Sequence, residues 1–371
     1  MLTTKAAVLR EAGPDRWWRV EEIELDEPKA GEVLVRFLAA GMCHSDDHIR
    51  SGDSPGRLPL VGGHEGAGVV EAVGAGVTRV GVGDHVICSF IPVCGTCRYC
   101  STGRQNLCDA GANAMTGCLP DGTFRFHSGG EDLGGMCVLG TFSERAVLSE
   151  TSCVPYEPDL PPELAALVGC GVTTGWGSAV YAAGVRAGQT VVIFGIGGVG
   201  INAVQGARYA GAKHVIAIDP VPFKLEMAKK FGATHALSDP AQARELVVEL
   251  TRGQLAEHAI LTVGVMNTEV VRQGAEMVGK DGQVTVTGVG DYELGVPGGL
   301  MTLYQRRFHG ALFGNANPLH DIPRLLGLYR SGDLRLDELV THRYRLDEVN
   351  DGYRDMLAGK NIRGVIIHGE S

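Results

Sequence analysis

Residues 190–200 read TVVIFGIGGVG, and this stretch decides the fold class. Its first part is apolar, as in a strand that is buried on both faces of a parallel sheet. Gly195, Gly197 and Gly200 then fit the spacing G-x-G-x-x-G. In a dinucleotide-binding turn the first glycine allows the tight turn, the second lets a pyrophosphate approach, and the third lets helix and strand pack closely. We therefore expect a strand, a phosphate-binding turn that also contains Gly198 and Val199, and a helix.

Asp219 lies where a dinucleotide-binding unit needs a carboxylate, because it ends the next expected strand, residues 214–219. Such a carboxylate accepts hydrogen bonds from the adenosine ribose and repels a 2′-phosphate, so the sequence favours NAD over NADP. The competing interpretation is a glycine turn required only for packing. That interpretation does not account for the complete order of strand, turn, helix, strand and aspartate.

Strands and helices alternate around this turn, which predicts an α/β fold with a doubly wound parallel sheet. Residues 1 to about 170 instead read as short β segments, with little helical periodicity and a long glycine-rich loop at 119–140. Beyond that point the expected helices extend to Ala210, over 224–231 and around 319–329, and the expected strands cover 258–263, 283–288 and 364–368.

The 371 residues have the composition of a folded globular protein, with 44% hydrophobic and 20% charged residues, which excludes a disordered chain. The 33 basic and 43 acidic residues give a net charge of −10, which argues against nucleic acid or an anionic membrane surface as the main partner. No run approaches the ~18 apolar residues of a membrane span. Charges near the amino terminus, at Lys5, Arg10 and Glu11, argue against a signal peptide. We therefore expect a cytoplasmic protein whose cysteines stay reduced.

Four cysteines form a tight cluster in the sequence: Cys94, Cys97, Cys100 and Cys108. Four thiolates close a tetrahedral zinc site and leave no position for a substrate, so the pattern predicts a structural zinc. Free thiols, a disulfide pair and an iron–sulfur cluster are the alternatives. Of these, the iron–sulfur alternative lacks an electron-transfer context in this glycine-rich segment.

Cys43, His64 and Cys170 are far apart in the sequence, but each lies close to glycine. Two thiolates and one imidazole leave one zinc position free for water or an alcohol, which is the arrangement of a catalytic zinc. Spacing alone leaves this assignment open, because a lone cysteine or histidine is more often a core or surface residue.

Together these motifs resemble those of the zinc-dependent medium-chain alcohol dehydrogenases over essentially the whole chain. The resemblance rests on CHSDDH at 43–48, GHE at 63–65, the four-cysteine cluster, GCG at 169–171, the glycine turn with Asp219, and NIR at 361–363. It implies a GroES-like, β-rich catalytic domain at 1–171 and a Rossmann coenzyme domain at 172–314. It also implies that residues 315–371 complete the catalytic domain.

The resemblance implies that Cys43, His64 and Cys170 bind the catalytic zinc, with Glu65 and Asp46 in outer positions that orient the ligands. A zinc-bound alkoxide would transfer hydride to NAD. The proton would leave through Ser45, the nicotinamide ribose and His48. Without the resemblance, Ser45 reads as a helix cap and His48 as a solvated surface residue. The remaining implied contacts are His44 and Arg363 at the pyrophosphate, Asp219 and Lys224 at the adenosine ribose, Thr174 near the nicotinamide, and Phe90 in the substrate pocket.

The implied reaction is the oxidation of a small-molecule alcohol to an aldehyde, and its reverse, by an enzyme with two zinc ions per chain and NAD. S-(hydroxymethyl)glutathione (formaldehyde) dehydrogenase is the first alternative, because it shares every metal and coenzyme motif. The actinobacterial NDMA-dependent nicotinoprotein alcohol dehydrogenases, which keep NAD bound, are the second. A structural protein that binds zinc and NAD is the non-enzyme alternative. Residues 298–314 resemble a dimerisation edge, so we expect a homodimer or homotetramer.

Overall fold

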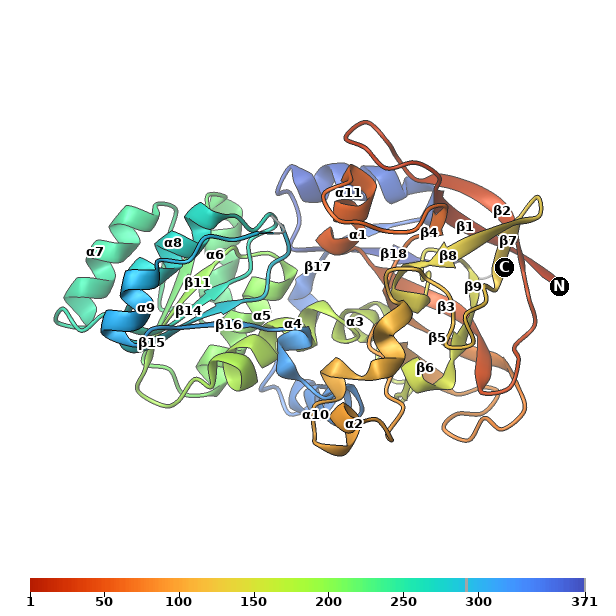
Figure 1. The fold of residues 1–371 in the computed structure, drawn as a ribbon, viewed down its shortest axis with the longest axis horizontal. Helices are drawn as coiled ribbons and strands as arrows, with labels where there is room; N and C mark the ends of the chain where they lie inside the picture. Colours follow the sequence, from red (N-terminus) through yellow and green to blue (C-terminus); the bar gives the residue numbers. More distant parts are fainter. Residues whose placement is uncertain (291–292, 370–371) are drawn as a thin grey trace. The chain divides into compact units, whose positions relative to one another are not determined.

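The computed structural model describes residues 1–290 and 293–369, which form two compact units. The first unit contains Met1–Cys170, Asn317–Tyr329 and the described residues from Leu336 onward. The second contains Gly171–Ala316 and Arg330–Arg335. The chain therefore passes from the first unit into the second and then returns to the first (Figure 1).

The first unit is rich in β structure. Its strands are β1 (Leu2–Leu9), β2 (Arg19–Leu25), β3 (Glu32–Gly41), β4 (Leu60–Val61), β5 (Glu65–Val73), β6 (His85–Cys88), β7 (Phe126–Ser128), β8 (Glu131–Gly135), β9 (Arg145–Ser149), β10 (Cys153–Pro155), β17 (Val340–Tyr344) and β18 (Arg363–Ile367). Its helices are α1 (His44–Ser51), α2 (Arg98–Ser101), α3 (Pro162–Val168), α10 (Pro318–Arg330) and α11 (Val349–Leu357). Five strands close a barrel in the order β1-β2-β7-β8-β4, and a second sheet runs β10-β6-β5-β3-β18-β17 with β9 paired to β3.

Strand β3 organises this second sheet, because it pairs with three others. Gly41, at its end, lies opposite Glu65 of β5 and opposite Val365 of β18. Most residues of β3 are buried, as expected for a strand with neighbours on both sides and a covered face. This pairing brings the carboxy-terminal strand beside the strands that carry the amino-terminal motifs.

The second unit is a parallel sheet flanked by helices (Figure 1). Its strands are β11 (Thr190–Phe194), β12 (His214–Ile218), β13 (His235–Leu237), β14 (Ala256–Leu261), β15 (Val278–Val286) and β16 (Arg307–Gly310), and its helices are α4 (Gly171–Gly177), α5 (Gly198–Tyr209), α6 (Pro222–Lys230), α7 (Pro240–Leu250), α8 (Thr268–Met277) and α9 (Gly298–Tyr304). The strand order is β13-β12-β11-β14-β15-β16. The order reverses beside β11, which is the point where open α/β sheets bind ligands.

The sequence at 190–200 forms this unit for clear physical reasons. All five residues of β11 are buried, which fits an apolar strand with neighbours on both sides. Gly195 has a φ of +84°, a conformation that L side chains rarely adopt, and Gly197 is the residue before helix α5. At Gly200 a Cβ atom would collide with the Gly195 carbonyl oxygen, so helix and turn pack closely only with glycine there.

One local expectation was wrong. The segment 119–140 is not a plain loop, because it contains the hairpin β7–β8, whose strands pair with β2 and β4 and complete the barrel. The segment after Cys43, where helical periodicity is weak, forms helix α1, which ends at Gly52 with a φ of +91°.

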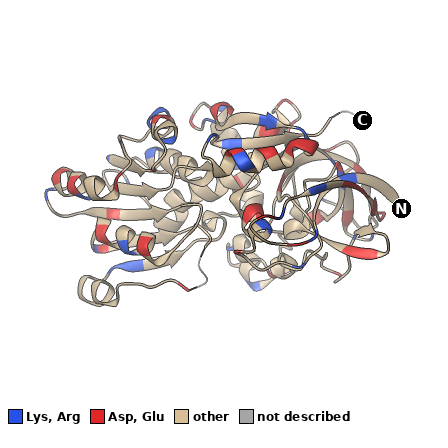
Figure 2. Ribbon diagram, turned by 90° about the horizontal axis from the view of Figure 1, so that it is seen from above, with Lys and Arg blue, Asp and Glu red and all other residues tan. Residues whose placement is uncertain are grey.

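Within the described residues, no single helix has the length and apolar character to cross a membrane. The bent pair Pro162–Val168 and Gly171–Ala183 meets that test by length and composition only, and most of its residues are buried in the protein. Figure 2 shows basic and acidic residues interspersed along the outer elements.

Candidate active site and metal centres

The four-cysteine cluster has the geometry of a zinc site. The Cys94 and Cys100 sulfurs are 4.0 Å apart, and the Cys97 and Cys108 sulfurs are 3.9 Å apart. Four sulfurs at the zinc–thiolate bond length of about 2.3 Å would lie ~3.8 Å from one another in a tetrahedron. The donor chemistry and the spacing therefore fit zinc.

Backbone groups prepare this cluster for a cation. The Cys97 N–H donates to the Cys94 sulfur at 3.3 Å, and the Cys94 N–H donates to the Cys108 sulfur at 3.3 Å. Although burial acts in the opposite direction, the N–H groups of Thr96 and Cys97 lower the pKa of Cys94 to about 6. A thiolate at neutral pH is the form that binds metal.

A second donor set comes from three separate elements of the first unit. Cys43 immediately precedes helix α1, His64 precedes strand β5, and Cys170 follows helix α3. The donor atoms of Cys43, His64, Glu65 and Cys170 all lie within 4.8 Å of one another. The structure thus brings together residues up to 127 positions apart in the chain (170 − 43).

Asp46 fixes the orientation of the His64 ring. Its Oδ2 lies 3.0 Å from His64 Nδ1, and its Oδ1 accepts a hydrogen bond from the Gly63 N–H at 2.8 Å. The side chains of both residues are almost completely buried. Because Nδ1 faces the carboxylate, Nε2 is the nitrogen left to face a metal, as in many carboxylate–histidine–zinc arrangements.

Glu65 and Arg363 form a buried ion pair behind this donor set. The same guanidinium also donates to the Met42 carbonyl oxygen at 3.0 Å. Gly41 makes room for the pair, because a Cβ there would collide with Glu65 Oε2 and come within 3.1 Å of Arg363 Nη2. The pairing of β5, β3 and β18 is what brings these residues together.

The charges around the set favour a bound cation. A hydrogen bond with Cys170 has the largest effect on the Cys43 thiol. Together with the positive charges of His64 and Arg363, it lowers the pKa of Cys43 well below its usual range. Burial lowers the pKa of His64, but Asp46 and Cys43 outweigh it and raise that pKa well above normal. A deprotonated thiol beside a histidine that attracts positive charge is the pattern expected where a metal cation belongs.

The helix α1 carries the residues assigned to proton transfer. The Ser45 hydroxyl lies 3.6 Å from the Cys43 sulfur. His48 is 2% exposed, so it is not a solvated surface residue, and its ring centroid lies 4.8 Å from that of the half-buried His44. His48 Nδ1 is 3.5 Å from Asp53 Oδ2, and the Asp53 side chain is 52% exposed.

Phe90 lies against the donor set, with its ring 5.7 Å from the His64 ring at an interplanar angle of 86°. Sequence reasoning missed three neighbours: Gly41, Asp53 and Tyr353, whose buried hydroxyl donates to the Cys43 carbonyl at 3.5 Å. No motif contains Tyr353, because it is far from Cys43 in the sequence. Asp53 is near CHSDDH, but only the helix places it beside His48.

In the second unit, the glycine turn leaves space for a phosphate group. A Cβ at Gly197 would meet no atom within 4 Å, so the turn is open beside helix α5. Asp219 is 4% exposed, and its oxygens accept hydrogen bonds from the Ile196 N–H at 2.7 Å and the Val221 N–H at 2.9 Å. Asp219 therefore stabilises the turn through these hydrogen bonds, and its remaining lone pairs could accept hydrogen bonds from a ribose.

Two other residues of this unit suit a dinucleotide. Thr174 is 8% exposed and its hydroxyl has no hydrogen-bond partner among the described residues, so a ligand group would satisfy it. Lys224 lies half-buried on helix α6, close in sequence to Asp219. Val265 is 50% exposed.

Comparisons with known proteins agree with this geometry. Residues 29–159 match the family model of the alcohol dehydrogenase GroES-like domain, and residues 198–331 match that of the zinc-binding dehydrogenases. Over 370 residues the chain is 58% identical to the NDMA-dependent alcohol dehydrogenase of Amycolatopsis methanolica, which covers 99% of both chains. It is 39% identical over 376 residues to the S-(hydroxymethyl)glutathione dehydrogenase of Synechocystis sp., covering 98% of this chain and 100% of that one. The crystal structure of benzyl alcohol dehydrogenase from Acinetobacter calcoaceticus matches with a TM-score of 0.91 and 30% identity over 100% of both chains.

The chain therefore belongs to the zinc-containing medium-chain alcohol dehydrogenases. It is an oxidoreductase of the GroES-like and Rossmann type, and its reaction is the zinc-dependent oxidation of alcohols to aldehydes with NAD. Its cofactors are zinc and NAD, and the two donor sets are consistent with two zinc ions.

Proposed function

We propose that Cys43, His64 and Cys170 hold the zinc at which the alcohol reacts, and that the four-cysteine cluster holds a structural zinc. The observation that carries this proposal is the convergence of the Cys43, His64 and Cys170 donor atoms, with Asp46 orienting the imidazole. Two thiolates and one imidazole leave a position for substrate, whereas four thiolates leave none. When bound, zinc makes the proton of an alcohol more acidic and polarises a carbonyl.

In this proposal Glu65 and Arg363 regulate the charge of the site. Two thiolates already balance a divalent cation, so a further free carboxylate would add unwanted negative charge beside it. The buried Arg363 guanidinium neutralises Glu65 and keeps its carboxylate oriented. Phe90, packed against His64, supplies apolar surface beside the metal ligands and helps to exclude water.

We propose that the proton leaves through Ser45, the nicotinamide ribose and His48, and that Asp53 is the outer end of this path. His48 is buried and needs a further group to pass a proton to solvent. Asp53 is half-exposed and lies beside the His48 ring. The Ser51 hydroxyl, helped by His48, lowers the pKa of Asp53, so its carboxylate stays ionised and keeps a negative charge beside the His48 ring.

His48→Gln is expected to lower kcat/KM for an alcohol by about tenfold or more at pH 7, because general-base transfer is removed. The loss should shrink toward pH 10, where hydroxide can take the proton directly. Asp53→Asn should give a smaller loss with the same pH trend. Steady-state rates from pH 6 to 10 test this path, and parallel profiles for wild type and His48→Gln would contradict it.

For the coenzyme we propose His44 and Arg363 at the pyrophosphate, with Gly195, Gly197 and the start of helix α5 supplying backbone N–H groups. Asp219 and Lys224 would hold the adenosine ribose. Thr174, whose hydroxyl lacks a partner, would contact the nicotinamide. The carboxylate at 219 would repel a 2′-phosphate and select NAD.

We further propose that NAD stays bound between turnovers and that a second acceptor reoxidises it. The similarity that supports this is the 58% identity to an enzyme named for its dependence on NDMA. Purified protein should therefore oxidise an alcohol with NDMA and no added NAD, and heat denaturation should release about one NAD(H) per chain.

The measurement is NDMA bleaching together with nucleotide analysis of the released supernatant. If activity depended strictly on added NAD and denaturation released none, the protein would be a dehydrogenase that exchanges NAD at each turnover, and the proposal would be wrong. Faster turnover of S-(hydroxymethyl)glutathione than of simple primary alcohols would instead support the glutathione-dependent alternative.

We also propose that the protein is a cytoplasmic homodimer or homotetramer. The cysteines of the described chain form no disulfide, which suits a reducing compartment. Strand β16 ends the parallel sheet, and nearby Leu303 is 78% exposed, so this edge offers unpaired backbone groups and apolar surface to a second copy. Light scattering on the purified protein should give a mass of two or four chains, and a mass of one chain would refute the proposal.

A further inference from the structure

A cavity of about 1060 Å³ lies in the second unit, at the amino ends of strands β14 and β15. The glycine turn follows the carboxyl end of β11, which runs parallel to β14. The cavity is therefore at the opposite edge of the sheet from the coenzyme turn. Its volume is at the upper end of the range for small-molecule sites.

The charges that line the cavity are unbalanced. The basic side chains are Arg244, Lys280, Arg306 and Arg307, and the acidic ones are Glu257, Glu276 and Asp281. Each acid already has a partner: Glu257 accepts from the Thr190 N–H at 2.8 Å, Glu276 pairs with Arg272 outside the cavity, and Asp281 lies 3.7 Å from Arg307 of the cavity itself.

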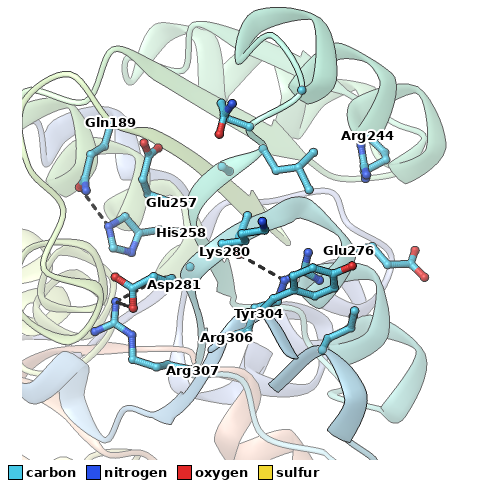
Figure 3. A pocket seen from close by; sticks show the side chains of 17 residues that line it. Gln189, Arg244, Glu257, His258, Glu276, Lys280, Asp281, Tyr304, Arg306 and Arg307 are labelled. Atoms are coloured by element: carbon cyan, nitrogen blue, oxygen red, sulfur yellow. Dashed lines mark hydrogen bonds and ion pairs between the residues drawn. The ribbon is translucent and has the colours of Figure 1, made fainter. Parts of the chain in front are cut away.

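Three cations are left without a carboxylate partner in the described part of the chain. Arg244 and Lys280 form no ion pair there, and Arg306 donates only to the Ala275 and Gly279 carbonyls, at 2.7 and 3.2 Å. Burial and the nearby Arg244 lower the pKa of Arg306, while Tyr304 and Glu276 act in the opposite direction and only partly offset them. Figure 3 shows Arg306 stacked on the Tyr304 ring with Lys280 close by, and Arg244 farther off on helix α7. An anion between these groups would balance their positive charge.

The other part of the cavity presents a buried acceptor. His258 is 5% exposed, and its Nε2 lies 3.0 Å from Gln189 Oε1 (Figure 3). That oxygen also accepts from the Arg186 N–H at 2.7 Å, so it is an acceptor and His258 Nε2 carries the proton. His258 Nδ1 is then a bare acceptor, and it has no hydrogen-bond partner among the described residues. Burial lowers the pKa of His258 to about 4, so the ring stays neutral near pH 7.

We propose that this cavity binds a small organic oxyanion that also carries a hydroxyl or amine donor. The phosphate or carboxylate group would lie among Arg244, Lys280 and Arg306, and the donor would bind His258 Nδ1. A buried lone pair is costly to leave unsatisfied, and three cations without a counter-ion are unusual in a chain of net charge −10. The proposed site shares no residue with the zinc and coenzyme sites, and its Tyr304 and Arg307 belong to the α9–β16 edge proposed above for the second copy.

Calorimetric titration with glucose 6-phosphate tests the proposal, because this probe has both a phosphate and hydroxyl donors. The titration uses the protein as purified with saturating NAD, so that the coenzyme site is filled. We expect one site per chain with a Kd below about 1 mM, and weaker binding of glucose and of inorganic phosphate. Gluconate, titrated in parallel, distinguishes a carboxylate site from a phosphate site.

The double variant Arg244→Gln/Lys280→Gln should weaken binding by at least about tenfold, since two charge-assisted contacts are lost. His258→Phe should weaken binding of the organic probe but not of inorganic phosphate. Arg272→Gln is the matched control, because Arg272 is paired with acids and does not line the cavity. Unchanged alcohol oxidation in each variant shows that the fold is intact.

Three results would overturn the proposal. The first is that neither glucose 6-phosphate nor gluconate binds. The second is that Arg272→Gln weakens binding as much as the double variant, which would indicate general electrostatics. The third is that His258→Phe binds glucose 6-phosphate as wild type does, which would indicate an adventitious ion only.

Discussion

Replacing His64 with alanine is expected to remove one of two zinc ions per chain and to lower kcat/KM for an alcohol by on the order of 10⁴-fold. The reason is that His64 is the only nitrogen donor of its set and Asp46 orients it. Without it, the Cys43 and Cys170 thiols and Glu65 remain, a set that lacks the imidazole and its fixed geometry. Metal analysis and steady-state kinetics on the same preparation provide the measurement.

Cys137→Ser is the matched control for this prediction. Cys137 is a thiol whose pKa burial raises to about 11, and it interacts electrostatically with His64, yet it lies outside both donor sets. The control should keep two zinc ions and most of the activity. If His64→Ala kept both metals, or if Cys137→Ser lost one, the assignment of the active-site ligands would be wrong.

Replacing Cys100 with serine is also expected to remove one zinc ion, but to lower the stability of the protein rather than abolish its activity. The four-cysteine cluster organises a segment with few strands or long helices, so the bound metal supplies much of its folding free energy. We expect the Tm to fall by on the order of 10 °C. Below that Tm the catalytic zinc and measurable activity should remain.

Cys118→Ser is the control here, because Cys118 is a buried thiol just beyond the cluster and belongs to neither donor set. Its zinc content should stay at two per chain and its Tm should change little. Loss of catalytic activity in Cys100→Ser with no change in Tm would show that the cluster is not structural.

Motifs that are short in sequence could be predicted because their geometry is local. The cysteine cluster closes within one segment, and the turn at 195–200 needs only a strand before it and a helix after it. For such local sites, the spacing of the residues is enough to predict the metal–ligand distances and the backbone conformation.

Features that depend on distant pairing could not be read in this way. Glu65 and Arg363 are 298 residues apart, and only the alignment of β5, β3 and β18 brings them together. The hairpin β7–β8 lies in a glycine-rich segment whose intrinsic strand preference is low, and its pairing with β2 and β4 decides its structure.

The burial of His48 was missed for a related reason. A polar sequence such as CHSDDH favours a solvated helix, yet α1 buries Asp46, Asp47, His48 and Arg50. Asp47 and Arg50 pair at 2.6 Å, and Arg50 binds the carbonyls of Pro14 and Arg16 at 3.1 and 2.7 Å. These contacts satisfy the buried polar groups, which periodicity alone cannot reveal.

X-ray diffraction from crystals of the purified protein, recorded on both sides of the zinc absorption edge, tests the central claim most directly. We expect two anomalous peaks per chain, one within the four-cysteine cluster and one bonded to Cys43, His64 and Cys170 at about 2.0–2.3 Å. A zinc peak at the cysteine cluster alone, or a second peak beyond bonding distance of these three side chains, would contradict the account.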